Sequence, residues 1–213
     1  PIYIHFACSI FRYNFDKKVV NQIVKCVEKN TPDIIVVTGD AISPIWITSG
    51  TRDSYKQLDA FLALFEKIGI PYTYCFGNHD ATGTASKKYI SDKIEKAEHS
   101  FYLGGVDNVQ GMGNYVVKVE TNGVLSSSFI LMDSNQNLDG DYEGISAKQV
   151  VWYEQKIKEL QAEKADIKNI LFIHVPIPEY ASFYAESKKG NQNYEIELGS
   201  KSEKVCVKNE KNV

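Results

Sequence analysis

Apolar residues in the first hundred positions form two kinds of pattern. Short continuous apolar runs have the length of buried β-strands. Between and after them, apolar residues recur every three or four positions, which is typical of amphipathic helices. Alternation of the two predicts a parallel sheet with crossover helices. We predict strands over 2–6, 34–38 and 72–76, and helices over 16–30, 54–68 and 86–97.

The pattern changes after residue 110. Two β-rich segments, 115–121 and 124–132, flank the dipeptide Asn122-Gly123. This arrangement is the strongest short-range signal for a β-hairpin, and a hairpin is antiparallel. A second sheet or an antiparallel edge therefore begins here. A helix over 146–164 and a buried strand over 169–174 follow.

The 213 residues suffice for one large domain, which we place at 1–185. Residues 186–213 are rich in Lys, Glu, Asn and Ser and poor in apolar residues. Such a composition predicts a polar surface loop or tail of the same domain.

Charge and cysteine content exclude several classes. The net charge of −3, without a basic stripe, gives no reason to require a nucleic acid partner. No apolar run approaches the roughly 18 residues of a membrane span, and no signal peptide is visible. The compartment and the oligomeric state have no signature in the sequence. Zinc ribbons and redox dithiols are excluded by the wide spacing of Cys8, Cys26, Cys75 and Cys206.

Polar side chains follow three of the predicted strands. Asp40 comes after strand 34–38, Asn78-His79-Asp80 after strand 72–76, and His174 ends strand 169–174. Ligands of open α/β sheets bind outside the carboxyl ends of the strands. Carboxylate and amide oxygens and imidazole nitrogens are ligands for divalent metals. The sequence therefore predicts a metal site at this edge.

Two ions about 3.5–4 Å apart can clamp a phosphate group and activate a water molecule. Asp40 could bridge such ions, and Asn78 offers an amide oxygen and His174 an imidazole nitrogen as further ligands. His79 would donate a proton or stabilise an oxyanion, and Asp80 would orient its imidazole. Taken singly, Asp40 also suits a turn or a helix cap, and His174 a hydrogen-bonded core position.

The blocks Thr38-Gly39-Asp40 and Gly77-Asn78-His79-Asp80, with His174, resemble the calcineurin-like metallophosphoesterases. Gly113-Asn114-Tyr115 and the segment 174–180 are most similar to the branch related to purple acid phosphatases. The resemblance covers about residues 1–185. It implies an α/β fold of two stacked mixed β-sheets flanked by helices, a four-layer sandwich that here lacks its last strands.

The same resemblance implies a dinuclear site that holds two divalent or trivalent ions of Mn, Fe or Zn. A phosphorylated small molecule or a phosphoprotein would be the substrate. His5 matches the histidine of the family block D-x-H and would hold the second ion with Asp40.

The chain departs from the family pattern in three places. Tyr3 replaces the aspartate of D-x-H, no G-H-x-H block follows His174, and Ser43 stands where purple acid phosphatases have a tyrosine. We therefore expect an incomplete site. The leading prediction is a metal-dependent phosphoesterase. The alternatives are an inactive binding or scaffold module of the same fold, and a truncated fragment of an active enzyme.

Outside these blocks, His99 lies in the polar segment Glu98-His99-Ser100. We expect it to be a solvated surface residue.

Overall fold

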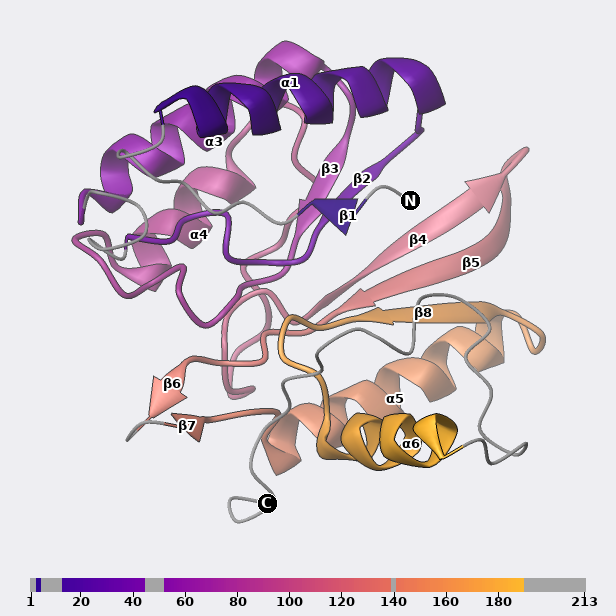
Figure 1. Ribbon diagram of the computed structural model, residues 1–213. Helices are drawn as coiled ribbons and strands as arrows, with labels where there is room; N and C mark the ends of the chain where they lie inside the picture. Colours follow the sequence, from indigo (N-terminus) through magenta and orange to yellow (C-terminus); the bar gives the residue numbers. More distant parts are fainter. Residues whose placement is uncertain (1–2, 5–12, 45–51, 139–140, 190–213) are drawn as a thin grey trace.

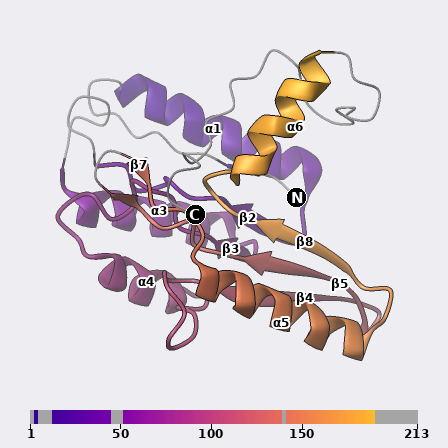
Figure 2. The same cartoon turned by 90° about the horizontal axis from the view of Figure 1, so that it is seen from below.

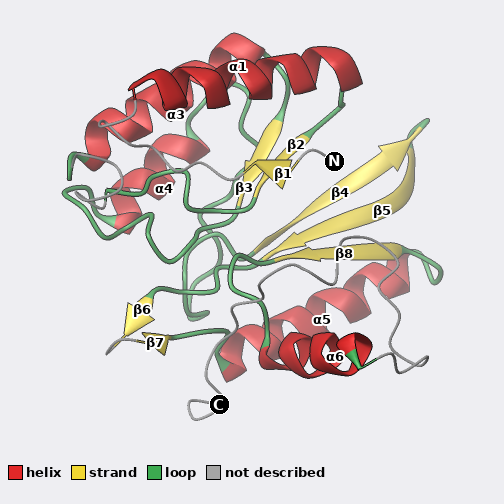
Figure 3. Cartoon of the chain, in the orientation of Figure 1, coloured by secondary structure: helices red, strands yellow, loops and turns green. Residues whose placement is uncertain are grey.

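The computed structural model describes residues 3–4, 13–44, 52–138 and 141–189 (Figure 1). Two β-sheets lie in the middle of the molecule, and helices cover the outer side of each (Figure 3). The predicted α/β fold of two sheets flanked by helices is confirmed.

The first sheet contains three parallel strands in the order β1-β2-β3. Helices α1, α3 and α4 connect these strands or follow them, and all three lie on the same side of the sheet (Figure 1). The strands are β1 (Tyr3–Ile4), β2 (Ile35–Val37) and β3 (Tyr72–Tyr74), and the helices are α1 (Tyr13–Asn30), α3 (Ser54–Ile68) and α4 (Lys87–Glu95).

The second sheet is mixed, with the order β4-β5-β8. Strands β4 and β5 form the predicted antiparallel hairpin, and β8 pairs parallel to β5. Helix α5 lies along the side of this sheet that faces away from the first (Figure 2). The elements are β4 (Tyr115–Thr121), β5 (Val124–Leu131), β6 (Asn137–Leu138), β7 (Asp141–Tyr142), α5 (Ala147–Glu163), β8 (Lys168–Phe172) and α6 (Pro178–Lys188).

Local residue chemistry explains where several elements begin and end. Asn122 (φ 53°) and Gly123 (φ 73°) are both left-handed, as a two-residue hairpin turn of type I′ requires. The Asp53 side chain caps the start of α3, and Gly69 ends the helix in the left-handed conformation. Ser146 begins α5 with a capping box.

The last residues of strand β5 are buried on both faces, which explains the apolar run from Phe129 to Met132. Phe129 and Leu131 belong to the large core that includes the first sheet and its helices. Ile130 and Met132 point to the opposite side and pack with Trp152 of α5. Alternation of this kind follows from the two-residue period of a strand.

Two features differ from the sequence prediction. Helix α6 forms in a segment for which we predicted no element, and Pro178 at its first turn fits the helical φ and needs no hydrogen-bonded N–H there. It continues to Lys188, past the boundary expected at residue 185. The short pair β6–β7 also had no clear sequence signal. The extent of the domain and the tail stays a prediction, because 190–213 lie outside the described residues.

Among the residues described, no helix has the length and apolar character needed to cross a membrane.

Candidate metal centre

The predicted ligands Asp40 and His174 lie side by side where the two sheets meet. Asp40 follows β2 of the first sheet, and His174 follows β8 of the second. The distance from His174 Nε2 to Asp40 Oδ2 is 3.2 Å. The structure thus brings together two side chains that are far apart in the sequence.

The turn after β2 requires a backbone that few residues adopt. Gly39 has φ 93°, and Asp40 is also left-handed, with φ 55°. A Cβ on Gly39 would lie 2.5 Å from the Gly77 nitrogen and 2.9 Å from Nδ1 of His174. A Cβ on Gly77 would lie 2.2 Å from Asp40 Oδ1. The glycines of both blocks therefore allow the loops after β2 and β3 to touch.

Asp80 fastens these two loops together. Its Oδ2 accepts hydrogen bonds from the backbone N–H groups of Gly77 (2.6 Å) and Asp40 (3.0 Å). Its Oδ1 accepts one from the N–H of Ile42 at 2.9 Å. Burial, and then the charge of Asp40, raise the pKa of Asp80 to about 6, although these hydrogen bonds act in the opposite direction.

These contacts differ from the role that we expected for Asp80. We predicted that it orients the imidazole of His79, but both carboxylate oxygens are engaged by backbone N–H groups. The Gly77 donor is three residues before Asp80 in the turn, where residues i and i+3 face each other, and the other two donors belong to the loop after β2. Asp80 thus holds the conformation of Asp40.

His79 lies beside Asp40 in the same loop contact. Its backbone N–H donates a hydrogen bond to Asp40 Oδ1 at 2.9 Å. The side chain is partly exposed, and no residue within the described ranges makes a hydrogen bond to its ring. As far as the described residues go, both ring nitrogens are therefore available to a bound molecule.

His174 has a defined tautomer. Its Nδ1 lies 2.7 Å from the carbonyl oxygen of Thr38, and because a carbonyl only accepts, Nδ1 must carry a proton. Nε2 then faces Asp40 either unprotonated or as a second N–H. Burial lowers the pKa of His174, but the hydrogen bond to Asp40 and the charge of Asp40 outweigh it and raise the pKa.

The pKa of Asp40 shifts in the complementary direction. Burial alone would raise it, but the hydrogen bond from His174 and the positive charge of that ring lower it below its ordinary value. The N–H and the charge of His79 act in the same direction. A buried carboxylate held in its anionic form is suited to bind a cation.

The chemistry of these side chains fits a divalent metal ion. Metal-binding histidines usually donate their second ring N–H to a carbonyl or carboxylate, as His174 does to Thr38. Asn78 is buried and directly precedes His79, whose N–H contacts Asp40. The expected ligand His5 lies outside the described residues and stays a prediction. Tyr3 is described only through the backbone pairing of β1 with β2.

The sequence did not reveal a buried ion pair that lies beside this centre. Asp133 follows β5 and is fully buried, where it pairs with Lys87 of α4. Its Oδ2 also accepts from the N–H of Met112 at 2.7 Å, and the Lys87 ammonium lies 5.1 Å from the ring centre of Phe76. The position of Asp133 after an apolar strand is a usable signal, but nothing in the sequence marks Lys87 as its partner.

Comparison with known proteins agrees with the resemblance seen in the sequence. The family model described as "Calcineurin-like phosphoesterase" matches residues 4–198. "Probable inactive purple acid phosphatase 14" of Arabidopsis thaliana is 25% identical, over 92% of this chain and 52% of its own length. "Probable inactive purple acid phosphatase 29" of the same plant is 24% identical, over 75% of this chain and 46% of its own length.

A yeast relative carries a different name. "Phosphatase DCR2" of Saccharomyces cerevisiae is 24% identical, over 89% of this chain and 33% of its own length. The chain thus spans about half, or less, of the length of these relatives.

Proposed function

Because this chain belongs to the calcineurin-like phosphoesterase family, we propose that it serves to hydrolyse a phosphate ester by metal-activated water. The observation that carries the proposal is the contact of His174 Nε2 with Asp40 at 3.2 Å, while Nδ1 is held by Thr38. This geometry directs an imidazole nitrogen and a carboxylate oxygen to one point. This chain covers only part of the length of its relatives. The activity of the whole protein is therefore part of the proposal.

In this proposal Asp40, Asn78 and His174 hold one ion, and Asp40 and His5 hold another. Manganese, iron and zinc all accept such mixed oxygen and nitrogen ligands. When bound, these ions lower the pKa of a water molecule and polarise a phosphoryl oxygen.

The remaining roles belong to protein groups. His79 donates a proton to the leaving group or a hydrogen bond to the phosphoryl oxygens, because its ring is partly exposed and free of hydrogen bonds to described residues. Asp80 acts indirectly by keeping Asp40 in its left-handed conformation. The substrate would be a phosphorylated small molecule or a phosphoprotein.

A second candidate is an inactive binding or scaffold module on the same fold. Two of the three relatives described above carry the word "inactive" in their names, and Tyr3 replaces the aspartate of the family block. A tyrosine hydroxyl has a pKa near 10 and is a poor substitute for a carboxylate at neutral pH. Such a module would bind ions or a phosphorylated ligand without turning it over.

An assay of aryl phosphate hydrolysis separates these candidates. The chain is stripped of metal, reloaded with Mn²⁺, Zn²⁺ or Fe²⁺, and tested on p-nitrophenyl phosphate and its bis-ester. The proposal predicts metal-dependent turnover that is lost in Asp40→Asn and reduced about 10²–10⁴-fold in His79→Gln. The matched control is Asp92→Asn, which replaces an exposed carboxylate on α4 and should keep full activity.

Each outcome decides between the candidates. Bound metal without turnover in the wild-type chain would favour the inactive module. Equal turnover in wild type, Asp40→Asn and His79→Gln would exclude the proposed mechanism.

A further inference from the structure

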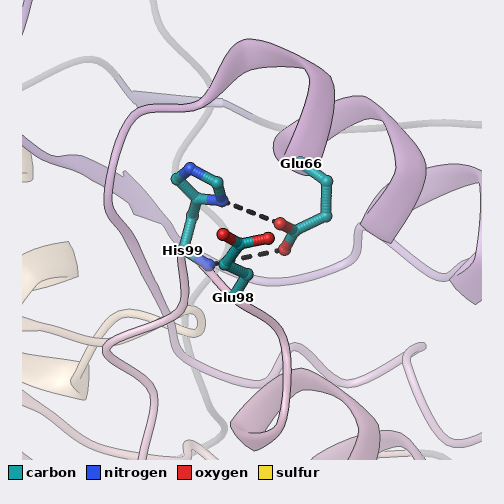
Figure 4. Close-up of side chains that lie close together, drawn as sticks. All are labelled: Glu66, Glu98 and His99. Atoms are coloured by element: carbon teal, nitrogen blue, oxygen red, sulfur yellow. Dashed lines mark hydrogen bonds and ion pairs between the residues drawn. The ribbon is translucent and has the colours of Figure 1, made fainter.

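Three ligand-bearing side chains meet at a place distant from the candidate metal centre. Glu66, Glu98 and His99 bring one atom each within 4.8 Å of one another (Figure 4). The Nδ1 atom of His99 lies 2.7 Å from Glu66 Oε2. His99 is therefore half-buried against another element, contrary to the expectation of a freely solvated residue.

The backbone around this cluster is fixed by secondary structure. Glu66 lies in the last turn of α3. The carbonyl of His99 accepts the N–H of Tyr72 at 2.9 Å, and Phe101 donates its N–H to the Tyr72 carbonyl at 2.7 Å. Residues 98–101 thus run alongside the beginning of β3.

This position separates the cluster from the candidate metal centre. The cluster lies at the start of β3, whereas Asn78 and His79 follow its end. Six residues lead from Tyr72 to Asn78, which is about 20 Å of extended chain at roughly 3.3 Å per residue. One ion could not serve both.

The electrostatics of the cluster favour a cation. Glu66 and Glu98 carry two negative charges beside one imidazole. Among the residues that the structure describes, no Lys or Arg forms an ion pair with either carboxylate, although several other surface carboxylates have a lysine partner. Like charges this close repel each other, and a bound cation would remove the repulsion.

The ligand types favour a borderline metal over Mg²⁺ or Ca²⁺. Zinc accepts imidazole and carboxylate at about 2.0–2.2 Å, which places pairs of ligands about 3.3–3.6 Å apart. The contact of 2.7 Å between His99 Nδ1 and Glu66 Oε2 would widen to admit the ion, and the exposed side chain of Glu98 can move to close the longer spacings. His99 directs Nδ1 to the carboxylates, since Nε2 lies on the side of Gly69.

We propose that Glu66, Glu98 and His99 form a structural zinc site that joins the end of α3 to the segment after α4. The neutral imidazole of His99 would carry its proton on Nε2, so that the lone pair of Nδ1 binds the ion. Water completes the coordination. The site is independent of the phosphoesterase activity, and its ion would stabilise the fold by linking two helices to the start of β3.

Zinc binding to matched variants tests this proposal. The metal-free chain is titrated with Zn²⁺ by calorimetry at neutral pH, and its thermal unfolding is followed with and without Zn²⁺. The variants Glu98→Gln and His99→Gln each remove one ligand, whereas Glu154→Gln changes an exposed carboxylate of α5 that is not in the cluster. All are also made in an Asp40→Asn background, which disables the candidate metal centre.

We expect wild type and Glu154→Gln to bind the same number of zinc ions. Glu98→Gln and His99→Gln should weaken binding to one of these sites about tenfold or more, and should lose the matching rise in Tm, in both backgrounds. Mg²⁺ should give no such rise. Circular dichroism checks that each variant folds. If His99→Gln does not fold, the zinc affinity of Glu98→Gln, a substitution at an exposed position, tests the proposal by itself. Equal zinc affinity in all four proteins, or no zinc binding by the wild type, would overturn the proposal.

Discussion

The carboxylate of Asp80 accepts the backbone N–H of Asp40 at 3.0 Å. The same oxygen accepts the N–H of Gly77, and the other oxygen accepts that of Ile42. One buried side chain therefore fixes the loops after β2 and β3 relative to each other. The left-handed conformation of Asp40, and hence the direction of its side chain toward His174, depends on this arrangement.

Asp80→Asn should destabilise the chain by about 2 kcal/mol, because asparagine has one acceptor oxygen and its amide would place a donor against a backbone N–H. Urea unfolding measures the change. Asp92→Asn removes an exposed carboxylate that pairs with Lys88, and should change stability by less than about 0.5 kcal/mol. Equal effects of the two substitutions would show that Asp80 does not hold the loops.

Gly39→Ala should destabilise the chain by about 3 kcal/mol and weaken Mn²⁺ binding, because the added Cβ meets the backbone of Gly77 at 2.5 Å in a left-handed turn. Gly123→Ala is the matched control. Gly123 also has positive φ, but nothing lies within 4 Å of its Cβ position, so only backbone strain of about 1 kcal/mol is expected. A Gly39→Ala variant no less stable than Gly123→Ala would contradict the loop contact.

Tyr115→Phe tests the connection between the two sheets. The Tyr115 hydroxyl accepts the N–H of Tyr74 at 3.0 Å and donates to its carbonyl at 2.8 Å, and it also contacts the hydroxyl of Thr73. Removing it leaves these buried groups without a partner and should lower stability by about 2–3 kcal/mol. The exposed substitution Tyr55→Phe should be nearly neutral, and a similar loss in both variants would argue against the bridge.

The contact of Asp40 with His174 predicts a specific pH dependence in the metal-free chain. The folded pKa of His174 is raised above its ordinary value, so its contribution to stability is complete below pH about 6.5 and is lost as the pH rises through the folded value. Asp40 behaves oppositely. Its folded pKa is lowered, so its contribution is present above pH about 4 and is lost as the pH falls through the folded value.

We therefore expect the difference in unfolding free energy between wild type and His174→Gln to shrink as the pH rises from 6.5 to 9. Urea unfolding in the presence of a chelator measures it. A difference that grows over this range would mean that the two side chains do not form an ion pair.

Much of the fold was predictable because hydrophobic period and turn chemistry act locally. Helix α3 was predicted at its observed bounds, and the Asn122-Gly123 turn identified the hairpin. The contact of Asp40 with His174 was predictable because each residue follows an apolar strand, and the ligand roles stay predictions. Helix α6 was not, because its residues lack a clear apolar stripe and its start depends on Pro178.

Roles that depend on long-range contacts could not be predicted. Nothing near Asp80 in the sequence shows that its oxygens bind the N–H groups of Asp40 and Ile42. The same holds for His99, whose partner Glu66 lies on another helix. Such pairs arise from the packing of elements, which the spacing of residues along the chain does not encode.

The most direct test of the account is the anomalous difference map of a crystal of this chain grown with Mn²⁺. The account predicts a manganese peak about 2.0–2.3 Å from both Asp40 Oδ2 and His174 Nε2, with the Thr38 carbonyl still bound to Nδ1. A map without a peak between these two side chains, at a manganese concentration that saturates binding in solution, would contradict it.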